Sequence, residues 1–297
     1  MKDIQKNKLV VILGPTASGK TALSIILARK FNGEIVSADS RQVYKKMDIG
    51  TGKITKKEMR GVPHHLLDVA NPKTKYSVAR YQKKSTKTIN TISKKGKLAF
   101  LVGGSAFYIY SVVDGYQFPD MKANPILRQQ LEKKSLQELQ KMLKELDPRR
   151  YKTIETQNKR RLVRAIEIAK ELGSVPELNK NPQFDCLLLG IKKEKEKLAK
   201  LIHKRQIKQF KQGMIKEVKN LKKSGVSWKR LDSFGLEYRW IARYLQNKIN
   251  RPEMEERLET DTIKFSKRQM TWFKKDARIH WIKTQKQAEQ LVKKFLK

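Results

Sequence analysis

The chain has 297 residues, enough to bury a large core, and its 68 lysines and arginines against 29 aspartates and glutamates give a net charge of +39. Such a charge repels itself in a compact fold unless an anionic partner relieves it; nucleic acid is the usual partner, and a lysine-rich proteome is the alternative cause. No segment approaches the ~20 apolar residues of a membrane span, and a single cysteine, Cys186, excludes an internal disulfide. We therefore expect a soluble, cytoplasmic protein without a membrane partner.

The first predicted element is a short buried strand at residues 9–13, followed by a glycine-rich loop and an amphipathic helix over residues 21–30. The loop fits the pattern G-x-x-x-x-G-K-[ST] with Gly14, Pro15, Thr16, Ala17, Ser18, Gly19, Lys20 and Thr21. In such a loop backbone N–H groups surround a polyphosphate, the lysine neutralises it, and the threonine hydroxyl helps to hold Mg²⁺. The sequence therefore predicts a phosphorylated ligand at residues 14–21 and Mg²⁺ at Thr21.

Three further apolar runs, at residues 34–38, 97–102 and 185–191, are predicted strands with helical stretches between them. Near-continuous apolar strands that alternate with helices indicate a parallel sheet covered on both faces. We predict an α/β fold, a P-loop NTPase-like core with a parallel sheet flanked by helices. Ligands of such sheets bind beyond the carboxyl ends of the strands, where the phosphate loop, Asp39 and residues 103–105 would meet.

Residues 120–181 have a different character, because prolines at 119, 125, 148 and 176 separate charged helical stretches with little strand character. A sheet strand is predicted again after this region, so we interpret it as a helical insertion domain. The core would then be discontinuous, formed by residues 1–119 and 182–297. After Glu194 the chain is predicted to be almost wholly helical and strongly basic.

Asp39 ends the second predicted strand, where a carboxylate meets Mg²⁺, abstracts a proton, or only caps a turn. No other apolar strand ends in a carboxylate, whereas a nucleotide hydrolase would have a second strand-end aspartate and a group that positions water. Gly103 and Gly104 indicate backbone that a flat or bulky group approaches closely. The phosphate loop is thus present, but the residues for γ-phosphoryl transfer are incomplete.

Arginines suggest where anions bind. Helical spacing places Arg160 and Arg164 together, opposite the apolar stripe of their helix, which suits either a nucleic-acid backbone or a solvated face. Arg205 falls on the apolar face of its helix and needs an anion, either a diphosphate or a salt-bridge partner. Residues 268–274 mix basic and aromatic side chains, as nucleic-acid surfaces and packed helix faces both do.

Short motifs along essentially the whole chain resemble those of the tRNA dimethylallyltransferase family, the bacterial-type tRNA isopentenyltransferases or IPP transferases. They are GPTASGKT at 14–21, SADS at 37–40, MDIGT at 47–51, PHHLLD at 63–68, VGGS at 102–105 and RQMTW at 268–272. The resemblance implies transfer of a dimethylallyl group from dimethylallyl diphosphate to N6 of the adenosine 3′-adjacent to the anticodon, tRNA position 37. An adenylate isopentenyltransferase, which acts on a free nucleotide, and a P-loop kinase are the alternatives.

The same resemblance assigns roles to residues. It implies that the phosphate loop holds a leaving diphosphate, that Asp39 is the general base for N6, and that Lys20, Thr21 with Mg²⁺ and Arg205 stabilise the departing charge. It also implies that the anticodon stem-loop presents a flipped base, and we expect a monomeric enzyme. The implied tRNA-binding residues are Asp39, Ser40, Arg41, Gln42, Ser105, Arg128, Arg160, Arg161, Leu162, Val163 and Arg164.

Overall fold

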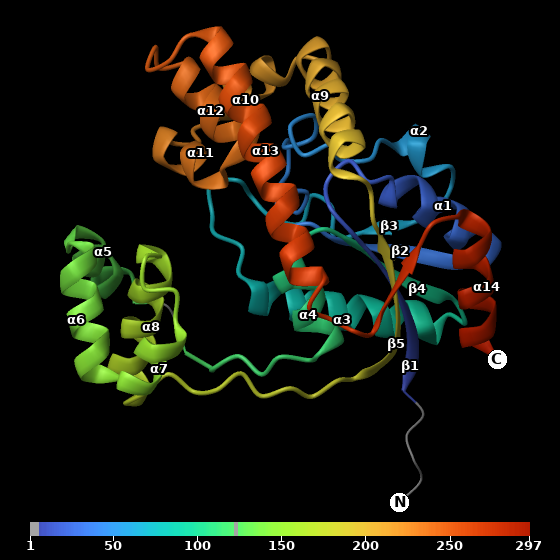
Figure 1. Ribbon diagram of the computed structural model, residues 1–297, viewed down its shortest axis with the longest axis horizontal. Coiled ribbons are helices and arrows are strands. Elements are labelled where there is room, and N and C mark those ends of the chain that lie inside the picture. Colours follow the sequence, from blue (N-terminus) through green and yellow to red (C-terminus); the bar gives the residue numbers. More distant parts are fainter. Residues whose placement is uncertain (1–5, 122–123) are drawn as a thin grey trace, which may run out of the picture. The chain divides into compact units, whose positions relative to one another are not determined.

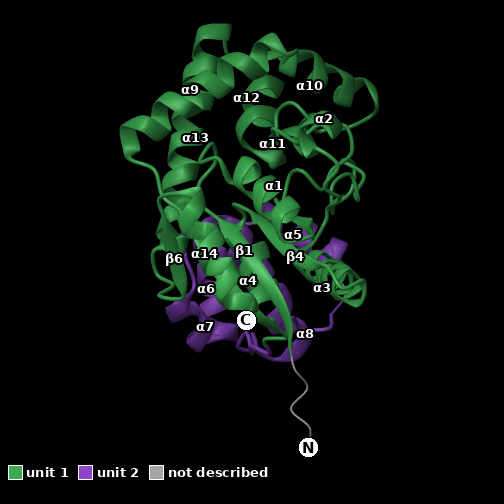
Figure 2. Ribbon diagram, turned by 90° about the vertical axis from the view of Figure 1, so that its right-hand side faces the viewer, with its two compact units in different colours: residues 1–115, 182–297 green, residues 116–181 purple. Residues whose placement is uncertain are grey.

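The computed structural model describes residues 6–121 and 124–297. Residues 1–5 and 122–123, which fall in the predicted core and insertion, lie outside this description. The chain divides into two compact units, one formed by residues 1–115 with 182–297 and the other by residues 116–181 (Figure 2). No helix of the described residues is long and apolar enough to cross a membrane.

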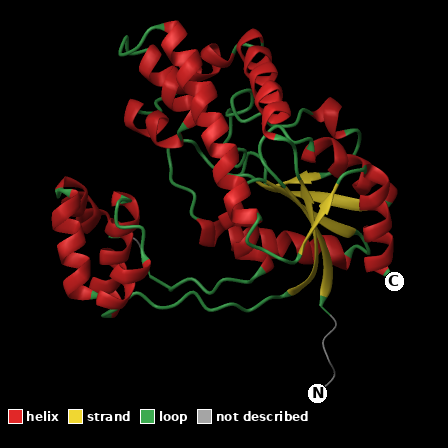
Figure 3. Ribbon diagram, viewed as in Figure 1, coloured by secondary structure: helices red, strands yellow, loops and turns green. Residues whose placement is uncertain are grey.

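A six-stranded sheet with the order β3-β2-β4-β1-β5-β6 forms the centre of the first unit (Figure 3). Its strands are β1 (Asn7–Leu13), β2 (Gly33–Ala38), β3 (His64–His65), β4 (Leu98–Gly103), β5 (Phe184–Ile191) and β6 (Ile279–Ile282). Every pairing is parallel, and β1 lies between β4 and β5. The predicted parallel α/β sheet is therefore confirmed, with the strand that precedes the phosphate loop near its middle.

Two strands were missed by the sequence analysis. The two-residue β3 pairs Ile35 with His64 at one edge, and β6 pairs Leu188 with Ile279 at the other. The expectation that the chain is almost wholly helical after residue 194 is therefore wrong at β6. Both strands are too short to show a hydrophobic period, and pairing with an already buried neighbour makes them strands.

Helices cover both faces of this sheet (Figure 1). The first unit contains α1 (Lys20–Lys30), α2 (Lys56–Met59), α3 (Val78–Lys94), α4 (Ala106–Val113), α9 (Lys195–Lys211), α10 (Met214–Lys223), α11 (Trp228–Phe234), α12 (Leu236–Tyr244), α13 (Arg251–Phe273) and α14 (Gln285–Leu296). Apolar side chains of α1 and α14, such as Leu27 and Val292, share one core with Val10 and Leu189 of the sheet. Helix α3 contacts β1, β2 and β4, and its Tyr81 hydroxyl donates to the Ser37 carbonyl at 3.0 Å.

The second unit is helical and has its own core. It contains α5 (Pro125–Lys133), α6 (Leu136–Leu146), α7 (Pro148–Thr153) and α8 (Lys159–Leu172). Each helix starts at a residue whose side chain accepts a hydrogen bond from a backbone N–H of the first turn, and these caps are Asn124, Ser135, Asp147 and Asn158. Leucines of α5, α6 and α8 pack together in this core, so the unit buries a continuous apolar stripe without contributing a strand to the sheet.

Candidate active site

The phosphate loop closes tightly between β1 and α1. A Cβ at Gly14, where φ is 152°, would lie 2.7 Å from the Ile191 carbonyl oxygen, so only glycine fits beside β5. Gly19 adopts φ 94° immediately before α1, a left-handed conformation that favours glycine. The Lys20 ammonium donates to the Pro15 carbonyl at 2.6 Å across the loop. Residues 14–21 thus have the strand–loop–helix arrangement in which a helix N-terminus faces an anion.

A cleft of about 390 Å³ lies at the carboxyl ends of β1, β2 and β4. Loops after these strands form one wall, and residues from α9, α11, α12 and α13 form the other. Most of the predicted site residues meet here, namely Thr16, Ala17, Ser18, Gly19, Lys20, Thr21, Asp39, Ser40, Arg41, Gln42, Ser105 and Arg205. Residues more than 180 positions apart in the sequence therefore share one hollow.

Asp39 organises the loop after β2. Its Oδ1 accepts hydrogen bonds from the backbone N–H groups of Arg41 at 2.8 Å and Gln42 at 3.3 Å. The Ser40 N–H donates to Ser105 Oγ at 3.0 Å, which ties this loop to the end of β4. Asp39 is thus a turn cap that also lines the cleft, and because a carboxylate has about four lone-pair sites, the cap leaves capacity for a ligand.

Two cations that face the cleft, Lys20 and Arg205, form no ion pair with a carboxylate of the described residues. Burial lowers the pKa of Lys20 to about 8, the Asp39 carboxylate opposes this shift, and Arg205 adds to it. Arg205 Nη1 donates to Thr16 Oγ1 at 2.8 Å, and no carboxylate in the described part of the chain forms an ion pair with it, so the salt-bridge alternative does not occur. Gly52 leaves room for Arg205, since a Cβ there would lie 2.8 Å from Nη2. This arrangement favours an anion between the helix and the loop.

The prediction for Gly103 and Gly104 needs correction, because protein atoms are what approach them. A Cβ at Gly103 would lie 2.1 Å from the Ala38 carbonyl oxygen, and one at Gly104 would lie 2.3 Å from Gln269 Nε2. The buried Gln269 donates to the Gly104 carbonyl at 2.8 Å and accepts from the Thr16 N–H at 2.9 Å. Sequence reasoning missed this brace of the phosphate loop, although the RQMTW motif at 268–272 was its signal.

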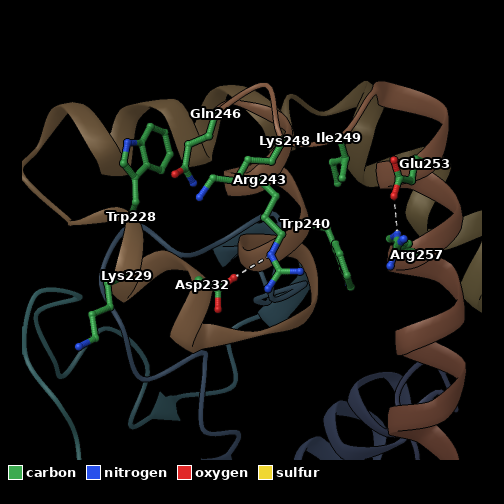
Figure 4. Close-up of a pocket in the computed structure, with 10 residues that line it drawn as sticks. All are labelled: Trp228, Lys229, Asp232, Trp240, Arg243, Gln246, Lys248, Ile249, Glu253 and Arg257. Carbon is green, nitrogen blue, oxygen red and sulfur yellow. Dashed lines mark hydrogen bonds and ion pairs between the residues drawn. The ribbon is translucent and has the colours of Figure 1, made fainter. Parts of the chain in front are cut away.

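A second hollow, of about 600 Å³, lies among α11, α12 and α13 and contains no residue of the phosphate loop (Figure 4). Arg243 Nε donates to Asp232 at 3.0 Å, and Arg257 Nε donates to Glu253 at 2.8 Å. Both guanidinium groups lie over the Trp240 ring, at 4.8 and 5.3 Å from its centroid. These arginines already have acidic and aromatic partners, so the smaller cleft is the better candidate for chemistry.

In residues 116–181, two predicted tRNA-binding arginines bind one buried carboxylate. Arg128 donates to Glu167 through Nε at 2.9 Å and Nη2 at 2.7 Å, and Arg164 Nη1 donates to the same group at 2.6 Å. Glu167 is only 1% exposed. Burial alone would raise its pKa, but the hydrogen bonds from Arg128 and Arg164 lower it overall. Arg128 and Arg164 therefore hold this unit together.

The prediction for residues 160–164 must be restricted to part of the helix. Leu162 and Val163 are buried in the core of the second unit, so their side chains are not available to a nucleic acid. Arg160 is exposed on α8, and Arg161 is exposed and pairs with Glu155 at 3.0 Å. Only these two of the five residues carry the exposed charge of the predicted surface.

Comparisons with known proteins agree with one another. A model of the IPP transferase family matches residues 42–276. The chain is 39% identical to a tRNA dimethylallyltransferase of Carboxydothermus hydrogenoformans over 97% of this chain and 96% of that protein. It is 42% identical to tRNA dimethylallyltransferase 1 of Syntrophus aciditrophicus, over 92% and 93%.

Solved structures extend this similarity to the whole fold. The tRNA isopentenylpyrophosphate transferase of Bacillus halodurans has a TM-score of 0.74 at 35% identity, with coverage of 98% of this chain and 96% of that chain. A eukaryotic dimethylallyltransferase acting on tRNA has a TM-score of 0.77 at 27% identity, with coverage of 90% and 69%.

Proposed function

Because this chain belongs to the IPP transferase family, we propose that it transfers a dimethylallyl group from dimethylallyl diphosphate to N6 of adenosine 37 in tRNA. The observation that carries this proposal is the meeting of Asp39, Lys20 and Arg205 in one cleft beyond the phosphate loop. We call this hollow the catalytic cleft. It offers a carboxylate for a proton and two cations for a leaving diphosphate, and the full-length similarity to tRNA dimethylallyltransferases supports this use.

The phosphate loop, Lys20 and Arg205 would hold the diphosphate of the donor. Backbone N–H groups at the start of α1 and the two cations lie where negative charge grows as the C1–O bond breaks. Thr21 is exposed and lines the catalytic cleft, so its hydroxyl fits a role in holding Mg²⁺, which when bound would neutralise part of the diphosphate charge. The electron pair of the broken bond leaves on the diphosphate.

Asp39 would act on the acceptor. The N6 lone pair attacks C1 of the dimethylallyl group, the C1–O bond breaks, and the N6 proton moves to the Asp39 carboxylate. The two backbone N–H groups bonded to Oδ1 fix the orientation of this side chain. General bases of this kind contribute about 10²- to 10⁴-fold to the rate.

The proposed tRNA contacts lie on two surfaces, one in each compact unit. Ser40, Arg41, Gln42 and Ser105 line the catalytic cleft and would contact bases of the anticodon loop around a flipped adenosine. In residues 116–181, the exposed Arg160 and Arg161 would contact backbone phosphates. We propose that the enzyme is a monomer and acts in the cytoplasm, where its tRNA substrate is found.

The direct test is to incubate the protein with unmodified tRNA, dimethylallyl diphosphate and Mg²⁺ and to digest the tRNA for mass spectrometry. We expect N6-(dimethylallyl)adenosine at position 37, and none in a control tRNA with guanosine there. Prenylation of free AMP, ADP or ATP without prenylation of tRNA would favour the adenylate enzyme instead. Steady phosphate release from ATP with no prenylated product would favour a kinase or ATPase.

A further inference from the structure

Glu237 is a buried carboxyl group in the wall of the catalytic cleft for which the reaction above has no role. It lies in the first turn of α12 and is 9% exposed. Burial raises its pKa and the nearby Asp39 carboxylate adds to this, while Arg205, its own backbone N–H and Arg41 oppose the shift only in part. Its own backbone N–H is a hydrogen-bond partner of the carboxyl group. No other side chain in the described part of the chain forms a hydrogen bond or ion pair with it, so the carboxyl group keeps capacity for a ligand in the cleft.

The residues on both sides of Glu237 are anchored. The Phe234 carbonyl accepts a hydrogen bond from Arg41 Nε at 2.7 Å, which joins the end of α11, just before α12, to the loop that carries Asp39. Tyr238 donates through its hydroxyl to Glu217 at 2.8 Å, and a Cβ at Gly50 would meet that hydroxyl at 2.8 Å. Glu237 therefore has a fixed position in the same cleft as Asp39.

The backbone leading to Glu237 has positive φ angles at two successive residues. Leu236 has φ 41°, and Gly235 before it has φ 77°. A positive φ at a residue with a side chain has an energetic cost and persists only where surrounding contacts fix it. Here those contacts place the carboxyl group of Glu237 at the cleft.

The chemistry of adenine matches a neutral carboxyl group. Such a group has an O–H donor next to a carbonyl acceptor. Adenine has an N6–H donor next to an acceptor ring nitrogen, N1 on one edge and N7 on the other. Guanine has two adjacent acceptors, O6 and N7, on its N7 edge, so the pairing would be lost there. On the N1 edge, the O6 acceptor and N1–H donor of guanine could pair with the same carboxyl group, so only the N7 edge distinguishes the two purines. One hydrogen of N6 can bond to such a carboxyl while the other remains for Asp39.

On the premise of the proposed function, we propose that Glu237 is a specificity-determining residue that reads the acceptor adenine. Its carboxyl group accepts one N6–H hydrogen bond and donates a second to N7. The contact holds the amino group beside Asp39 and selects adenosine over guanosine.

Matched substitutions separate this role from that of an ionised carboxylate. Glu237→Gln keeps one donor and one acceptor, and Glu237→Leu keeps neither. For a tRNA anticodon stem-loop, we expect kcat/KM of Glu237→Gln to stay within about threefold of the wild type and that of Glu237→Leu to fall by about 10²-fold. An equal fall in both variants would mean that the charge is needed, as for a metal ligand or base, and would overturn the proposal.

Atomic changes in the substrate test the same contact without changing the protein. Stem-loops with 1-deazaadenosine or 7-deazaadenosine at the target position lack one ring acceptor each. We expect kcat/KM of the wild type to fall by about 10²-fold with 7-deazaadenosine and to change little with 1-deazaadenosine. Glu237→Leu should lose no further activity with 7-deazaadenosine, because the contact is already absent. A wild type insensitive to 7-deazaadenosine refutes the proposal even if Glu237→Leu does not fold.

Two controls complete the experiment. Pyrophosphate affinity and the thermal midpoint of both variants should match the wild type, since Glu237 is not proposed to hold the donor. The wild type must prenylate the unmodified stem-loop. If it does not, the proposed function fails; if it does and the analogue results are negative, only the role of Glu237 fails.

Discussion

In the catalytic cleft Asp39 influences the ionisation of Lys20 and lies in the same hollow as Arg205, yet it forms no ion pair with either. In residues 116–181, by contrast, Glu167 is hydrogen-bonded to both Arg128 and Arg164. Each region thus has a carboxylate near two cations. Where the charges bind one another they stabilise the fold, and where backbone groups hold them apart they remain available to substrates.

The largest expected effect comes from the carboxylate of the cleft. Asp39→Asn keeps an oxygen that can accept from the Arg41 and Gln42 N–H groups, but it removes the base. We expect kcat to fall by about 10²- to 10⁴-fold, while tRNA affinity, measured by filter binding, and the thermal midpoint change little. A large loss of tRNA affinity would reassign Asp39 to recognition.

Glu167→Gln should have the opposite effect, lowering stability and leaving kcat nearly unchanged. It leaves two guanidinium groups, on side chains that are 27% and 39% exposed, without their counter-charge. Because solvent screens these charges in part, we expect the free energy of unfolding to fall by about 2 kcal/mol. The measure is hydrogen exchange in α8 together with denaturant unfolding. Glu155→Gln is the matched control, because it breaks an ion pair whose side chains are 54% and 57% exposed and should cost less than about 1 kcal/mol. Equal losses would contradict the comparison.

Lys20 gives the cleft a dependence on pH. Its pKa is lowered to about 8, so the ammonium is charged below that pH and loses its charge as the pH rises through it. Pyrophosphate affinity at fixed Mg²⁺ should therefore be full below pH 8 and fall by up to about tenfold per pH unit above it. The affinity is measured by calorimetry, and the same measurement on Lys20→Met corrects for the ionisation of pyrophosphate itself. If the affinity of both proteins depended on pH in the same way, Lys20 would not be the group responsible.

The smallest effect is expected at the exposed arginines of α8. Arg160→Ala should weaken tRNA binding about threefold and reduce the salt dependence of binding by about one counterion. Lys170→Ala removes the same charge from the last turn of the same helix and should have less effect. If the two variants weaken binding equally, the net charge of the chain accounts for the attraction and the start of α8 has no special role.

Local pattern explains what the sequence could predict. The strand, glycine loop and helix around Lys20 are contiguous, so their order and spacing are visible in the letters. Arg205 was correctly placed on an inward face, but its partner, Thr16, lies 189 residues away, and no periodicity distinguishes a diphosphate site from a salt bridge. The same limit applies to Arg128, whose partner Glu167 is 39 residues away; the family resemblance marks the arginine but does not reveal the buried carboxylate.

The brace provided by Gln269 has a consequence during synthesis on the ribosome. Thr16, in the phosphate loop, donates to a side chain 253 residues further along the chain. The loop and its flanking strand leave the exit tunnel early, but their last support is translated only after α9–α12 and most of α13. In a nascent chain that still lacks α13, the phosphate loop would therefore lack its hydrogen bond to Gln269. Binding of the prenyl donor would then begin only as translation nears its end.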